Sequence, residues 1–551
     1  MITVFLGNNA GKAVIFLRKR MYGLLALLGL LFSGVLWRVY YLTRLQPLQT
    51  ATSQNSWKVT VASIRGTIYD CHRQPLVNAE TEYRAAVAPD EQALAAVQEA
   101  ADAAELTELR TQLSNRTPAA VRLQKPVGLM PGLELFLVPK RVGSRLLAPH
   151  LIGYLDHDGQ HGVAGVELAC DELLNQYAGA ATAAFAIDGS GRYLTGAPTN
   201  RTDTTARSRG GVVLTLDRDI QTVIEDIGAE LIPKGAIVVL EPSTGAIRGM
   251  ASFPTFQPST VAASIQSNDG ALLNRALAVY DCGSVFKTVT MAAALEQGIS
   301  TNETYTCNGS VKVGDTLFHC HNRLGHGVQN LTGAFAQSCN VCFIRLAQDT
   351  GAEALYSMAN NFGFDQAITL AGDLGAAKAV MPELSTLRSA PAAVANLSFG
   401  QGYLMASPLH IARMVATVAN GGVLPPVHLV AGYADENGSF TDVQQGRGQQ
   451  ILSASTASAL RRMMEAVVRN GTGKAAAPSV CTAAGKTGTA ETGQTGGNKP
   501  VVQSWFAGYF PAEEPRYVVT VLAEDAQNTG GQAAKCFCEI SNKLYALQVG
   551  K

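Results

Sequence analysis

The pattern of apolar and polar positions divides the chain into an N-terminal apolar block and two long regions of mixed character. The block from Met21 to Trp37 carries no charge and is at the short limit for crossing a bilayer. Residues 57–70 alternate like a β-strand, and residues 82–113 have an alanine-rich helical composition. Between residues 188 and 210, Gly, Ser, Thr and Arg replace the periodic patterns, which predicts a domain boundary.

The second region begins and ends with strand patterns. Residues 235–252 form two apolar runs around a Pro-Ser-Thr-Gly turn, which predicts a hairpin. Helical patterns dominate from Ser284 to about Asn470, and three further strands are expected over residues 480–491, 504–511 and 516–525. If the early and late strands meet in one antiparallel sheet that carries the helices, the fold class is α+β.

The apolar block is predicted to be a membrane anchor. Basic residues precede it at Lys12, Arg18, Lys19 and Arg20, so residues 1–20 are expected to be a cytoplasmic leader. The anchor is then residues 21–43, a single pass, and the rest of the chain lies outside the cell membrane. A cleaved signal peptide shares the basic start, but the sequence that follows is bulky and charged and lacks a small-x-small site. A buried soluble helix is the third alternative, which the adjacent basic cluster disfavours.

Length, charge and cysteine content limit the number of domains, the kinds of partner and the disulfides to be expected. A chain of 551 residues is too long for one hydrophobic core. Its 43 basic and 43 acidic residues balance, and the chain has no long basic run, which argues against nucleic acid as a partner. The ten cysteines are dispersed, so occasional disulfides or free thiols are expected rather than a dense scaffold.

Ser284 and Lys287 stand three residues apart at the start of an apolar helix pattern. Residues i and i+3 share a helix face, so the lysine amine can lie beside the serine hydroxyl. A serine nucleophile needs a base, and burial of Lys287 together with a nearby positive charge would lower its pKa enough to serve. The helix N-terminus would favour a developing oxyanion. Ser-x-x-Lys alone is weak evidence, because an N-capping serine beside a solvated lysine gives the same pattern.

Two further motifs follow in the order Ser-x-Asn and Lys-Thr-Gly, which together with Ser-x-x-Lys is the signature of active-site-serine penicillin-recognising enzymes. Ser338 can pass a proton between Lys287 and a substrate amine, and Asn340 can bind both Lys287 and a substrate amide. In the third motif, the cation of Lys486 and the hydroxyl of Thr487 suit a substrate carboxylate. Gly488 has no side chain, which suits a substrate backbone that approaches an edge strand. The amides of Ser284 and Thr489 are candidates for an oxyanion hole. Alone, Ser-x-Asn is often a helix cap and Lys-Thr-Gly a hairpin corner.

With these motifs in place, the chain resembles a class B penicillin-binding protein, a monofunctional peptidoglycan D,D-transpeptidase. The similarity extends to residues 238–258, to the segment around Ser284, to "LSFGQGYLMASPLHIARMVATVANGG" and to "SWFAGYFP". "SIRGTIYD" and "GVAGVELACDELL" resemble the family's N-terminal pedestal domain. The resemblance implies a pedestal over residues 44–205 and a transpeptidase domain over residues 206–551. That domain would have the serine β-lactamase-like fold, an antiparallel sheet with helices on both sides.

The resemblance also implies an activity and partners. Ser284 would form an acyl-enzyme with a peptidoglycan stem peptide, release D-alanine and pass the acyl group to a neighbouring stem, without a cofactor. β-Lactams would acylate the same serine, and a membrane-embedded glycan polymerase and other cell-wall machinery would be partners. A D,D-carboxypeptidase or β-lactamase is the rival enzyme, and a penicillin sensor or silent scaffold is the rival of another class.

The thiols carry two further hypotheses. Cys307 and Cys320 bracket a hairpin-like stretch and could form a disulfide. Three other cysteines lie beside catalytic residues, so their oxidation could perturb activity, although small buried thiols are an equally good interpretation. These are Cys282, which stands where the family commonly has proline, Cys339 and Cys342. A metal site among His319, Cys320, His321 and His326 lacks a recognised ligand pair, so no metal is predicted.

Overall fold

The computed structural model describes residues 7–44, 55–496, 499–524 and 531–549, and it divides into two compact units. The first comprises Met1–Ala62, Glu82–Leu137 and Ala181–Asp203, and the second Ser63–Thr81, Val138–Ala180 and Thr204–Lys551. The predicted limits of the leader, anchor, pedestal and transpeptidase domain describe functional parts rather than contact clusters, and they stay predictions.

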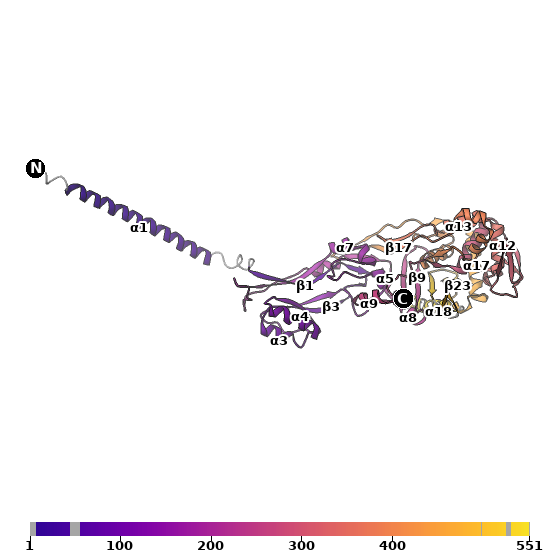
Figure 1. Cartoon of the computed structure of the whole chain (residues 1–551), viewed down its shortest axis with the longest axis horizontal. Coiled ribbons are helices and arrows are strands. Elements are labelled where there is room, and N and C mark those ends of the chain that lie inside the picture. Colours follow the sequence, from indigo (N-terminus) through magenta and orange to yellow (C-terminus); the bar gives the residue numbers. More distant parts are fainter. Residues whose placement is uncertain (1–6, 45–54, 497–498, 525–530, 550–551) are drawn as a thin grey trace. The chain divides into compact units, whose positions relative to one another are not determined.

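Helix α1 (Gly7–Arg44) contains the predicted anchor (Figure 1). Its segment Arg18–Tyr41 has a mean hydropathy of 1.7 and none of it is buried. Within the described ranges, this is the one helix that is long and apolar enough to cross a membrane. An apolar helix that buries nothing against its own chain would be costly in water, which supports a membrane environment.

The first unit contains two three-stranded sheets. One has the order β4-β3-β5 and the other β1-β6-β7. Alternate residues of β4 (Ala119–Leu123) are buried and pack with Leu109 and Leu113 of α4 (Ala103–Ser114). Every second residue of the strand and every fourth residue of the helix thus point into one small core. The other elements of the first unit are β1 (Ser56–Ile64), β3 (Glu80–Val87), α3 (Glu91–Val97), β5 (Leu133–Lys140), β6 (Gly179–Ala186) and β7 (Asn200–Asp203).

A five-stranded antiparallel sheet of order β10-β9-β25-β24-β23 organises the second unit. The predicted hairpin is present, with β9 (Gly235–Leu240) pairing with β10 (Ile247–Phe253). The three predicted late strands are β23 (Ala484–Gly496), β24 (Lys499–Phe510) and β25 (Tyr517–Ala523). Early and late strands join through β9 and β25, as predicted. Strand β23 is the last in the order, at the edge of the sheet.

Helices cover both faces of this sheet, because its strands are apolar on both sides. In β9, Ala236 and Val238 belong to one core and Ile237 and Val239 to the other. The core around Ile237 includes side chains of α8 (Arg218–Leu231) and α18 (Gln532–Val549). The opposite core includes those of α10 (Lys287–Glu296), α16 (Pro408–Ala419) and α17 (Ala454–Asn470). This confirms the predicted α+β fold.

Strands interrupt the region between residues 284 and 470, where helical patterns were expected to dominate. The antiparallel pair β12 (Thr304–Cys307) and β15 (Gly327–Asn330) encloses a second pair, β13 (Ser310–Val313) and β14 (Thr316–His319). Short alternating runs between glycines account for these strands. Residues 304–330 are called the strand lobe below. The helices beyond it are α11 (Leu331–Ala336), α12 (Asn340–Thr350), α13 (Ala352–Asn361), α14 (Leu384–Ser389) and α15 (Pro391–Ser398).

The remaining elements of the second unit are short. A four-stranded sheet of order β2-β8-β20-β21 combines β2 (Thr67–Tyr69), β8 (Gly211–Leu214), β20 (Val430–Ala434) and β21 (Phe440–Asp442). The others are α5 (Pro149–Ile152), α6 (Gly165–Ala169), α7 (Asp171–Gln176), η1 (Thr205–Arg209), η2 (Pro258–Thr260), α9 (Val261–Gln266), β11 (Tyr280–Asp281), η3 (Gly283–Phe286), β16 (Ile368–Ala371), β17 (Leu374–Ala376), β18 (Met405–Ala406), β19 (Val423–Leu424), β22 (Gln449–Gln450) and η4 (Lys474–Ala476).

Candidate active site

Ser284 lies in the 3₁₀ turn η3, and Lys287 is the first residue of α10. We expected the serine within the first turn of the α-helix, and the structure differs in giving it a tighter turn. In a 3₁₀ turn, side chains at i and i+3 eclipse each other, so the two residues still share one side. Gly283 begins the turn at a φ of 56°, and a Cβ there would lie 2.6 Å from the carbonyl oxygen of Thr489. Glycine therefore lets η3 approach β23.

The Lys287 amine is fully buried and has three polar partners. It lies 2.7 Å from the backbone oxygen of Ser338, 3.1 Å from the Ser338 hydroxyl and 2.7 Å from the side-chain oxygen of Asn340. The backbone and amide oxygens can only accept, whereas the hydroxyl can also donate. A neutral amine is thus satisfied when it donates to these two oxygens and accepts a hydrogen bond from the Ser338 hydroxyl. Burial lowers the pKa of Lys287 to about 7, because desolvation disfavours the charged form.

Ser338 holds an uncommon backbone conformation between α11 and α12. Its φ is 53°, in the left-handed region that costs a side-chain-bearing residue about 1 kcal/mol or more. The turn places Asn340 at the first position of α12. The Ser-x-Asn motif therefore directs two side chains at one buried amine. The alternative of a plain helix cap fails, since Cys339, the N-cap residue, makes no side-chain capping bond.

Lys486 on β23 is also fully buried. Its amine donates to the backbone oxygen of Thr487 at 3.1 Å and lies 5.6 Å from the ring centroid of Phe335. Burial first, and then the charge of Lys287, lower the pKa of Lys486 well below its usual value. The structure thus brings Lys486 near Lys287 but leaves it off the cavity wall. Its role toward a substrate carboxylate stays a prediction.

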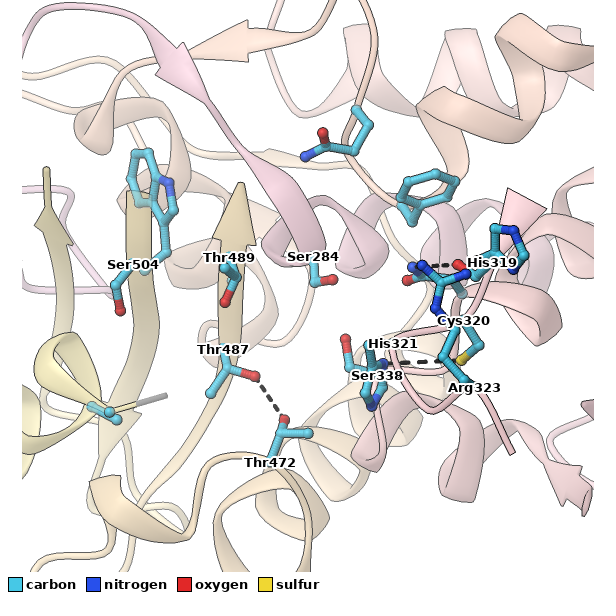
Figure 2. Close-up of a pocket in the computed structure, with 17 residues that line it drawn as sticks. Ser284, His319, Cys320, His321, Arg323, Ser338, Thr472, Thr487, Thr489 and Ser504 are labelled. Carbon is cyan, nitrogen blue, oxygen red and sulfur yellow. Dashed lines mark hydrogen bonds between the residues drawn. The ribbon is translucent and has the colours of Figure 1, made fainter. Parts of the chain in front are cut away.

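A cavity of about 620 Å³ brings most of the predicted site residues together. Its wall includes Ser284, Ser338, Asn340, Thr487, Gly488 and Thr489. Figure 2 shows the Ser284 hydroxyl between the strand that carries Thr487 and Thr489 and the turn that carries Ser338. Ser284 is half-buried, so its hydroxyl is open to a ligand. Three separate motifs thus converge on one cavity, with Lys287 and Lys486 buried behind its wall.

Gly488 is required for packing inside the protein. A Cβ at this position would lie 3.0 Å from both Trp505 Cβ and Val285 Cγ1, and 3.1 Å from the carbonyl oxygen of Cys282. We expected its missing side chain to admit a substrate backbone, and the contacts give another reason. Only glycine lets η3 pack this tightly on β23 and β24. The indole of Trp505 reinforces the junction by donating to the Asp281 carbonyl at 3.0 Å.

Sequence reasoning missed several residues of the cavity wall. Thr472 lies two residues after the end of α17, and its hydroxyl oxygen is 2.6 Å from that of Thr487 (Figure 2). Its signal in the sequence is the Gly-Thr-Gly run at 471–473, which predicts a tight turn but no partner. The strand lobe contributes His319, His321 and Arg323. Their placement follows from how the lobe folds over the site, which no local pattern reveals.

The disulfide hypothesised between Cys307 and Cys320 is not formed in this structure. All ten cysteines, which lie within the described ranges, are free. The hairpin between Cys307 and Cys320 does form, but the Cys320 sulfur lies 3.8 Å from the Cys339 sulfur and 3.5 Å from Nδ1 of His326. Cys282 and Cys342 are buried as well. The sensitivity of these thiols to oxidation stays a prediction.

The chain is similar in sequence to penicillin-binding proteins. The profile "Penicillin binding protein transpeptidase domain" matches residues 235–542, more than half of the chain. Penicillin-binding protein PbpB of Mycolicibacterium smegmatis is 33% identical over 422 residues, 72% of this chain and 63% of PbpB. The chain thus spans less than two thirds of the length of that relative. Peptidoglycan D,D-transpeptidase PbpA of Mycobacterium tuberculosis is 31% identical over 378 residues, 63% of this chain and 75% of PbpA.

A solved structure has a similar fold. Penicillin-binding protein 3 of Mycobacterium tuberculosis, in complex with ampicillin, is 27% identical with a TM-score of 0.66. The alignment covers 89% of this chain and 96% of that structure. The fold likeness therefore reaches well beyond the residues that the family profile matches.

Proposed function

Because this chain belongs to the penicillin binding protein transpeptidase family, we propose that it is a peptidoglycan D,D-transpeptidase that binds penicillin covalently. One observation carries the proposal. The Lys287 amine, with Ser338 and Asn340 as partners, lies behind the cavity that Ser284, Thr487 and Thr489 line. A buried amine of lowered pKa can act as the general base, and the half-buried serine beside it as the nucleophile, which are the two groups that acyl transfer requires.

In the first half-reaction, Ser284 Oγ attacks the carbonyl carbon of the penultimate D-alanine of a stem peptide. The hydroxyl proton passes to Lys287 Nζ, either directly or through the Ser338 hydroxyl. The amides of Ser284 and Thr489 stabilise the oxyanion of the tetrahedral intermediate. The carbon–nitrogen bond then breaks, the departing amine takes the proton from Lys287 through Ser338, and terminal D-alanine leaves. The product is an ester between Ser284 and the shortened stem.

In the second half-reaction, an amine of a neighbouring stem attacks the ester carbonyl. Its proton returns through Ser338 and Lys287 to Ser284 Oγ as the carbon–oxygen bond breaks, so the enzyme is regenerated and a cross-link is formed. A β-lactam enters the same first step, but its amine stays tethered to the acyl group after ring opening. The acyl-enzyme therefore persists.

Hydroxyl groups on β23 and beside it are suited to the terminal carboxylate of the donor. The hydroxyls of Thr472 and Thr487 are hydrogen-bonded to each other on the cavity wall. Behind them, the Lys486 amine donates to the backbone oxygen of Thr487. The two hydroxyls can each donate to a carboxylate, provided that their mutual bond opens when the donor binds. Because β23 lies at the edge of the sheet, a substrate peptide could pair with it as an additional strand.

Product analysis distinguishes transfer from hydrolysis. Purified full-length chain in detergent, given a pentapeptide donor and an acceptor amine, should release D-alanine and form cross-linked dimer. Free tetrapeptide without dimer would instead identify a D,D-carboxypeptidase, and turnover of intact penicillin a β-lactamase. A fluorescent penicillin should label the wild-type chain but not Ser284→Ala. Failure to label the wild type would contradict the proposal and favour a silent scaffold.

We further propose a single-pass topology, with residues 1–20 in the cytoplasm, an anchor over 21–43, a pedestal over 44–205 and a transpeptidase domain over 206–551. The basic residues before the apolar block support this orientation, since positive charge is retained on the cytoplasmic side. A membrane-embedded glycan polymerase is the proposed partner, since cross-linking needs newly made strands. Protease added outside spheroplasts should digest the catalytic part, and a digest that spares it would contradict the orientation. In living cells, a crosslinker placed on α1 should capture this polymerase.

A further inference from the structure

Beside the cavity, four side chains direct potential metal ligands at one point. These are Cys307, Cys320, His326 and Cys339, and their ligand atoms all lie within 4.8 Å of one another. All three thiols are buried, and the histidine is half-buried. We propose that this cluster, a Cys₃His set, is a structural zinc site. It is called the thiol cluster below.

The distances within the thiol cluster fit tetrahedral zinc. With zinc–sulfur bonds of about 2.3 Å and a zinc–nitrogen bond of about 2.0–2.1 Å, tetrahedral angles put two sulfurs roughly 3.8 Å apart and a sulfur and a nitrogen roughly 3.5 Å apart. The Cys320 sulfur lies 3.8 Å from that of Cys339 and 3.5 Å from Nδ1 of His326. Three thiolates and one imidazole in this geometry favour zinc over magnesium or calcium, which prefer oxygen ligands.

The ligands come from four separate positions that only the fold brings together. Cys307 ends β12, Cys320 follows β14, His326 precedes β15, and Cys339 is the N-cap residue of α12. This dispersion explains why no paired-ligand spacing is visible in the sequence. Of the four residues that the sequence suggested as ligands, Cys320 and His326 belong to the cluster, whereas His319 and His321 do not.

Backbone contacts hold the loops tightly around the cluster. The Cys320 amide donates to the Gly309 carbonyl at 2.9 Å. Gly325 has a φ of 85°, and a Cβ there would lie 2.3 Å from the Cys307 carbonyl oxygen. These backbone contacts keep the segments that carry Cys307 and Cys320 close together.

The strand lobe buries few large apolar side chains, chiefly Tyr305, Val313 and Phe318, which gives a metal a structural role. Leu317, Leu324 and Val328 are exposed. Small lobes with little buried apolar surface commonly depend on a metal or a disulfide. Binding balances simply, since zinc displaces the three thiol protons to solvent and takes the lone pair of neutral His326. The metal would tie the strand lobe to the turn before α12.

The site would also position catalytic residues. Cys339 stands between Ser338 and Asn340, both of which contact the Lys287 amine. Fixing the Cys339 sulfur fixes the backbone on both sides, including the left-handed conformation of Ser338. Zinc would thus be a positioning element behind the part of the cavity wall that Cys320 forms.

Metal analysis of the full-length chain in detergent tests the proposal. We expect about one zinc per chain in the wild type, and loss of most of it in Cys307→Ser, whose side chain does not line the cavity. Cys342→Ser is the matched control, because Cys342 is a buried thiol nearby that lies outside the cluster. If Cys307→Ser fails to fold, His326→Gln removes the one half-buried ligand at less cost to packing and should lose zinc too. Zinc retained in both variants would overturn the proposal.

Cobalt substitution and thiol chemistry give independent readouts. Cobalt added to chelator-treated wild type and to Cys342→Ser should produce a thiolate-to-metal charge-transfer band, which Cys307→Ser should lack. Peptide mapping without reductant distinguishes the rival arrangement. A Cys320–Cys339 or Cys307–Cys320 disulfide as the main native form, or zinc-free chain with alkylatable thiols, would overturn the site. Labelling by fluorescent penicillin should slow by about tenfold after zinc removal and recover with zinc but not magnesium.

Discussion

The Lys287 amine and the side-chain oxygen of Asn340 lie 2.7 Å apart, although the residues are 53 positions apart in the sequence. The Asn340 oxygen thereby accepts a hydrogen bond from the amine and helps to hold it in place. The contact also leaves the Ser338 hydroxyl as the one partner of the three that can return a proton. Lys287, Ser338 and Asn340 therefore form one hydrogen-bonded group, and changes to its members should have distinct effects.

Replacing Lys287 with methionine should abolish most acylation. The change removes the proton acceptor while keeping an unbranched side chain in a buried site, and general-base catalysis contributes about 10²–10⁴-fold. The rate of fluorescent penicillin labelling should fall by about that factor. Lys378→Met, at an exposed lysine, is the control and should label normally. A Lys287→Met chain that labels within about threefold of the wild type would exclude Lys287 as the base.

The labelling rate should rise with pH and reach half its maximum near pH 7. Lys287 must be neutral to accept a proton, and burial lowers its pKa to about 7. The same shift affects stability, because the unfolded chain binds this proton up to its ordinary pKa of 10.5. The contribution of Lys287 to stability is therefore most unfavourable below about pH 7 and becomes less so as the pH rises toward 10.5. Single-turnover labelling across pH checks the first statement, and a flat profile would contradict it.

Ser338→Gly and Ser338→Ala should separate the hydroxyl from the backbone conformation. Both remove the group that lies 3.1 Å from the Lys287 amine, so both should slow labelling by at least about tenfold. Only glycine relieves the left-handed conformation at φ 53°, so Ser338→Gly should be more stable than Ser338→Ala by about 1 kcal/mol. Thermal unfolding measures the difference. Equal stabilities would show that the surrounding turn changes conformation in one of the variants.

Gly488→Ala should damage both stability and labelling. The added Cβ would meet Trp505, Val285 and the Cys282 carbonyl at 3.0–3.1 Å, which pushes η3 away from β23. Overpacking of this kind typically costs about 1–3 kcal/mol. Gly128→Ala is the control, since a Cβ at that position meets nothing within 4 Å. A stable Gly488→Ala chain that labels normally would show that η3 and β23 can adjust to each other.

Thr472→Val should weaken capture of the ligand more than it slows the chemical step. The variant keeps the shape of the side chain but loses the hydroxyl that pairs with Thr487 at 2.6 Å. Loss of one such hydrogen bond is worth about 1 kcal/mol, or roughly a fivefold change in apparent affinity. The dependence of the labelling rate on penicillin concentration separates affinity from maximal rate. A fall in the maximal rate alone would assign Thr472 to the chemistry instead.

The sequence by itself determined the elements whose signals are local. The 235–252 hairpin, the late strands, the apolar block of α1 and the three motifs are all visible in short windows, because strand and helix periods depend on neighbouring residues. The motifs also identified Ser284, Lys287, Ser338 and Asn340 as candidates that meet, since their order and spacing are specific.

Tertiary structure alone decided how those pieces are used. It buried Lys486 behind the cavity wall, paired Thr472 with Thr487, and gave Gly488 a packing role. It also left Cys307 without the hypothesised disulfide and gathered it with three other side chains that the sequence scatters over more than thirty positions. Such contacts join residues far apart in the chain, so they depend on how strands and loops cross, which local periodicity does not encode.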